Sequence, residues 1–63
     1  MDDHAKVVAD RWANKRAEAI AEGMLPADFD KHMMAFMLWG GWSEENAKAI
    51  CDRAKKLSEK EVY

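Results

Sequence analysis

The stretch from His32 to Trp42 constrains this 63-residue chain more than any other feature. It reads HMMAFMLWGGW, so that after the histidine every residue is either apolar or glycine. A helix that is apolar on all sides has to be buried on all sides. Because so short a chain has few other elements to cover such a helix, we expect part of this surface to be covered by a partner.

The size of the chain supports that expectation. Sixty-three residues make a single domain, residues 1–63, and a domain of this size buries only about 60% of the surface that its unfolded chain exposes. Small domains are usually stabilised by disulfides, metals or oligomerisation. A single cysteine, Cys51, rules out an internal disulfide, and no cysteine and histidine cluster has zinc-ligand spacing. Oligomerisation or docking on a partner is therefore the expected means of stabilising this domain.

Charge and hydropathy exclude several classes of protein. The net charge of −2 differs from the basic balance of a typical nucleic-acid binder, and 49% hydrophobic residues are too many for intrinsic disorder. The acidic start at Asp2 and Asp3 is unlike a signal peptide. No apolar run approaches the roughly 20 residues of a membrane span. We therefore expect a cytoplasmic protein with no membrane contact, whose lone thiol suits a reducing compartment.

Glycine and proline divide the chain into three helices. Gly23 is placed to end a first helix, Pro26 to begin a second, and Gly40 and Gly41 to end it. Ser43 offers an N-cap for a third helix. No strand-like alternation is present. The predicted fold is an all-α, compact three-helix bundle, monomeric or dimeric, with helices at about residues 3–22, 26–39 and 43–60.

Helical periodicity assigns the faces of the two outer helices. In the first helix the shared face holds Ala5, Val8, Ala9, Trp12, Ala13, Ala19 and Ile20. In the third helix a narrow apolar stripe holds Ala47, Ile50, Cys51, Ala54 and Leu57. Much of the face of the first helix is alanine, which permits close approach of another helix, and Trp12 is its one large side chain.

Arg16 lies in the middle of the apolar face of the first helix. Its stem could lie along the core with the guanidinium in water. Alternatively, it could pair with a carboxylate, for which Asp28, Asp30 and Asp52 are the candidates.

The second helix differs because it has two apolar faces. Its main face is predicted to hold Phe29, Met33, Phe36, Met37 and Trp39. Met34 and Leu38 point the opposite way, beside Lys31. Either the other two helices flank this helix and cover both faces, or the second face binds a dimer mate or a foreign protein. Methionine suits an adaptable contact surface.

The predicted partner-binding patch therefore consists of Met34, Leu38 and Trp39, with Lys31 and Trp42 at its rim. Tryptophan is a frequent anchor at protein interfaces. Trp42 has a second interpretation, as a hydrophobic staple that fixes the entry into the third helix.

No arrangement of residues points to catalysis. Asp28 and His32 are one helical turn apart, but no second histidine is near, and capping of the second helix by Asp28 explains the carboxylate more simply. Cys51 falls on the apolar stripe, where it should be a small buried hydrophobe without a neighbouring base. We expect no catalytic residues, no metal site and no cofactor, and hence no enzyme.

The sequence thus favours a non-catalytic protein-binding module, acting as a stoichiometric regulator, adaptor or inhibitor. Its size would suit an accessory factor of a phage or plasmid. The alternative is a DNA-binding helix-turn-helix regulator that uses the third helix, whose candidate phosphate contacts are Lys48, Arg53, Lys55 and Lys56. Against that alternative, a recognition helix presents its first turn to the bases, and here that turn carries Glu44 and Glu45.

Overall fold

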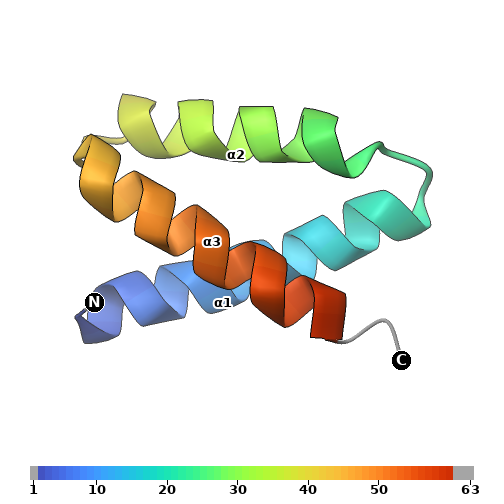
Figure 1. The fold of residues 1–63 in the computed structure, drawn as a ribbon, viewed down its shortest axis with the longest axis horizontal. Coiled ribbons are helices and arrows are strands. Elements are labelled where there is room, and N and C mark those ends of the chain that lie inside the picture. The colour runs from blue at the N-terminus through green and yellow to red at the C-terminus, as the bar shows by residue number, and fades with distance from the viewer. Residues whose placement is uncertain (1, 61–63) are drawn as a thin grey trace.

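The computed structural model describes residues 2–60 and confirms a compact all-α protein of three helices, with no strand in that range. Helix α1 spans Asp3–Ala21, α2 spans Pro26–Trp39 and α3 spans Glu44–Lys60. In Figure 1, α3 crosses over α1, whereas α2 lies along one edge of the molecule. The contact between α1 and α3 is the most extensive, and α2 touches each of them much less.

The alanine-rich faces explain why α1 and α3 approach so closely. Small side chains let helix backbones come together, and larger ones then fill the space beside the crossing. The buried hydrophobic core consists of Ala5, Ala9, Ala13, Phe29, Met33, Met37, Ala47, Ile50, Cys51 and Ala54. The predicted stripe of the third helix is confirmed, with Leu57 packed at the edge of the core. The predicted face of the first helix is confirmed except at Ile20, which is half-buried but lies outside the core cluster.

Two glycines set the corners. Gly23 follows α1 and Gly41 follows α2, each with a positive φ (+105° and +98°) that an L side chain rarely adopts. In both turns the next residue, Met24 or Trp42, donates its backbone N–H to the carbonyl five residues earlier, at 2.9 and 3.2 Å. This pattern is a Schellman motif, and it satisfies carbonyls that the helix end leaves free.

The helix starts are capped in different ways. Ser43 precedes α3 and its Oγ accepts the backbone N–H of Asn46 at 3.2 Å, as expected of an N-cap. The expected capping of α2 by Asp28 is wrong: Leu25 is the N-cap and no side chain caps the helix. Pro26 explains this, because proline at the first position has no N–H to satisfy and already holds a helical φ. Asp28 lies in the first turn, where the helix dipole favours its charge.

Candidate protein-binding surface

The last two turns of α2 carry seven consecutive apolar residues, from Met33 to Trp39. Only two of them, Met33 and Met37, are buried. Met34 is half-buried, and the others are exposed. Because a helix turns by about 100° per residue, an unbroken apolar run places side chains on every side, while α1 and α3 cover only one.

The predicted main face of this helix is partly wrong. Phe29, Met33 and Met37 are buried as expected, but Phe36 is 56% exposed and Trp39 is 84% exposed. At about 100° per residue, Phe36 lies about 60° and Trp39 about 120° around the helix from Met33. Both side chains are therefore turned out of the core toward the α1 side of the helix.

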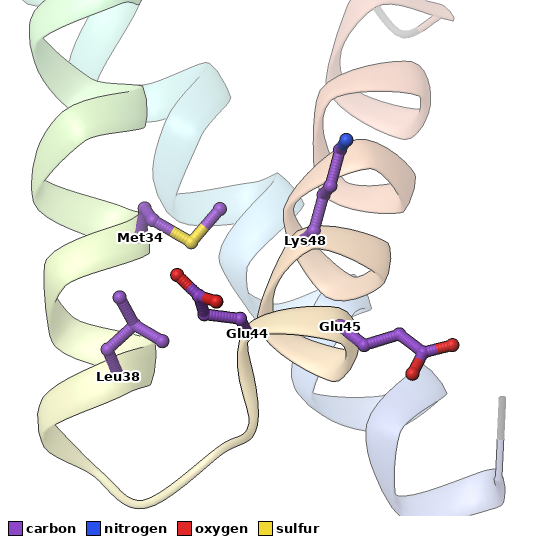
Figure 2. A pocket seen from close by; sticks show the side chains of 5 residues that line it. All are labelled: Met34, Leu38, Glu44, Glu45 and Lys48. Atoms are coloured by element: carbon purple, nitrogen blue, oxygen red, sulfur yellow. The ribbon is translucent and has the colours of Figure 1, made fainter.

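Met34 and Leu38 lie on the other flank of α2, one turn apart. Together with the start of α3 they line a groove of about 430 Å³, whose remaining walls are Glu44, Glu45 and Lys48. We call this the acidic groove. Figure 2 shows Met34 and Leu38 directed toward α3, with the carboxylate of Glu44 beside them and that of Glu45 turned away. The tight Gly40–Gly41 turn places the first residues of α3 against the last turns of α2.

A second hollow, the aromatic groove, lies between α1 and α2. Its centre is a chain of rings: Trp12 to Phe36 at 5.4 Å between centroids, and Phe36 to Trp39 at 6.0 Å. Two adjoining pockets of about 420 and 580 Å³ share Trp12 and Phe36. Their other lining residues are Val8, Arg11, Lys15, His32, Ala35 and Trp39. The charged side chains on this flank are therefore cationic, in contrast to the acidic groove.

The predicted patch is thus distributed over several sites. Met34 and Leu38 come together in the acidic groove, whereas Trp39 belongs to the aromatic groove. Lys31 is exposed. Trp42 is half-buried against the core and stacks on the ring of His4, with centroids 5.7 Å apart.

The aromatic groove does not follow from the sequence, because periodicity predicts that Phe36 faces the core, whereas it is mostly exposed. Trp12 packs against the core as predicted, but it also lines the groove. Phe36 was grouped with the buried methionines because it lies within about 60° of Met33 on the helix. The signal that could have revealed it is the cationic pair Arg11 and Lys15 on either side of Trp12, which indicates that Trp12 lies near the surface.

Of the two explanations offered for Arg16, a guanidinium in water is wrong, because the side chain is buried, and pairing with a carboxylate is confirmed, with Asp30 as the partner. Its Nε donates to Oδ1 of Asp30 at 2.8 Å, and a terminal nitrogen donates to Oγ of Ser58 at 2.6 Å. The side chain therefore joins α1 to both α2 and α3. Ser58 itself donates to the backbone carbonyl of Lys55 at 3.0 Å. Because Arg16 is only 3% exposed, this network is structural and presents no charge to a ligand.

The four candidate DNA contacts differ in their surroundings. Lys48 lines the acidic groove, and Lys56 is exposed. Arg53 lies 3.4 Å from a carboxylate oxygen of Asp10, and Lys55 lies 4.0 Å from one of Asp30. Two of the four cations are thus beside carboxylates of other helices.

Reactive groups are few in the described part of the chain. Cys51 is buried as predicted; burial, with help from neighbouring carboxylates, raises the pKa of its thiol. Residues 2–60 hold no group of three or more histidine, cysteine, aspartate or glutamate side chains arranged to bind a metal ion. Within the same range, no helix has both the length and the apolar character needed to cross a bilayer.

Comparison with known proteins adds no relatives: no family model, curated protein or solved structure matches this chain. Function has to be inferred from the surface itself.

Proposed function

We propose that this protein is a non-catalytic binding module, which acts as a stoichiometric regulator, adaptor or inhibitor by contacting protein through the exposed side of α2. The observation that carries the proposal is the run Met33–Trp39, in which apolar side chains continue around the helix although only Met33 and Met37 are buried. The binding surface comprises Met34, Ala35, Phe36, Leu38 and Trp39.

The magnitude of the exposed area supports this function. An aromatic side chain offers 150–250 Å² for burial, so that Phe36 and Trp39, at 56% and 84% exposure, leave roughly 300 Å² in water. At about 25 cal/mol per Å², covering this area gives a gross hydrophobic gain of about 8 kcal/mol, from which the loss of translational, rotational and side-chain freedom on binding is subtracted. Contiguous apolar patches of several hundred Å² on small soluble proteins commonly mark interaction sites.

DNA binding by α3 has weaker support. Glu44 and Glu45 occupy the first turn of α3, which a recognition helix presents to the bases. Arg53 and Lys55 each lie beside a carboxylate, which reduces the charge available for phosphates. We therefore expect only weak binding to duplex DNA, and we expect the replacement of Lys55 and Lys56 to leave it unchanged. If binding depended steeply on salt concentration and these replacements abolished that dependence, DNA binding would become the better supported function.

The test of the proposed function compares Leu38→Glu with a matched control, Val7→Glu. Val7 lies on α1 and is 49% exposed, whereas Leu38 is 41% exposed, so both variants place a carboxylate at an exposed apolar position. Both should fold, as judged by circular dichroism. The wild-type chain is first used to isolate its one-to-one binding partner from the source cell; this partner can be another protein or a second copy of the chain. In calorimetric titration, the partner should bind Val7→Glu as tightly as the wild type. It should bind Leu38→Glu at least ten-fold more weakly.

Three outcomes would overturn the proposal. Unfolding of Leu38→Glu alone would mean that Leu38 belongs to the core. Equal affinity of the two variants would mean that binding uses another face. Failure of the wild-type chain to bind either another protein or itself would mean that the α2 surface is not an interaction site.

A further inference from the structure

We draw no further inference here: the strongest candidate, the exposed apolar face of α2 between the aromatic and acidic grooves, carries none, because nothing in the structure shows what covers it.

Discussion

Replacement of Arg16 by alanine should remove a large part of the stability of this protein. The Arg16 guanidinium connects all three helices, through Asp30 on α2 at 2.8 Å and Ser58 on α3 at 2.6 Å. Breaking a buried ion pair by removing one partner costs about 3–5 kcal/mol, because the other charge is left uncompensated. Here the Asp30 side chain keeps 24% exposure and lies 4.0 Å from Lys55, so we expect about 2 kcal/mol.

That loss is large for a chain of this size. Small single cores rarely supply more than about 3–5 kcal/mol, and in domains of about 60–100 residues each kcal/mol shifts the melting temperature by about 4–8 °C. Arg16→Ala should therefore lower the melting temperature by about 10–15 °C. Arg16→Lys keeps the charge but not the planar fork of donors, and should give an intermediate value. Thermal unfolding followed by circular dichroism gives the melting temperature of each variant, and urea unfolding gives its free energy of unfolding.

A double-mutant cycle with Asp30→Ala isolates the pair. In the double variant no charge of the pair remains unpartnered, so its destabilisation should be smaller than the sum of the two single effects by about 1–2 kcal/mol. Additive effects within about 0.5 kcal/mol, or an Arg16→Ala variant as stable as wild type, would refute the assignment of Arg16 as the connection between the helices.

Three further predictions concern the core and the helix ends. Burial first, then the charges of Asp30 and Asp52, raises the pKa of the Cys51 thiol above its ordinary value of 9.0. The folded thiol keeps its proton to higher pH than the unfolded one, so its contribution to stability is complete below about pH 9 and is lost as the pH rises toward the folded pKa. Cys51→Ala should therefore lose stability less steeply than wild type above pH 9 in urea titrations, and a parallel pH dependence would contradict this. A Cβ added at Gly23 meets no atom within 4 Å, but the backbone keeps a φ of +105°, so Gly23→Ala should lose about 1 kcal/mol of stability from backbone strain alone. Gly23→Asn should lose less, and equal losses in the two variants would argue against a strained turn. Asp2 caps α1 by accepting a backbone N–H at 2.8 Å; Asp2→Ala should cost about 1 kcal/mol and Asp2→Ser much less, whereas equal stability of all three chains would show that this cap contributes nothing.

Most of the fold could be predicted because the helix limits depend on local chemistry. Gly23, Pro26 and Gly41 act through backbone φ values and missing N–H groups, which depend little on the rest of the molecule. The alanine-rich faces of the outer helices likewise follow from simple periodicity. The sequence shows that Arg16 lies on an apolar face and offers three carboxylates for it, but the choice of Asp30 depends on how α2 lies against α1.

The faces of α2 could not be predicted for a physical reason. Periodicity identifies a buried face by contrast with polar positions, and residues 33–39 offer no such contrast. Periodicity therefore places Phe36 in the core and leaves Trp39 between the main face and the predicted patch, although both side chains are mostly exposed. Only the positions of the neighbouring helices decide which side chains are covered, and those positions are set by long-range contacts. For the same reason, the separation of the predicted patch into two grooves required the structure.

The most direct test of an uncovered α2 surface is the free energy of unfolding of Trp39→Lys, measured by urea titration at submicromolar concentration, where self-association is negligible. The indole is 84% exposed, and a cation suits the C-terminal end of a helix. The variant should therefore be within about 0.5 kcal/mol of wild type, as is usual for exposed positions. A loss of about 3 kcal/mol or more, typical of truncating a buried tryptophan, would show that the side chain is packed inside the molecule and unavailable to a partner.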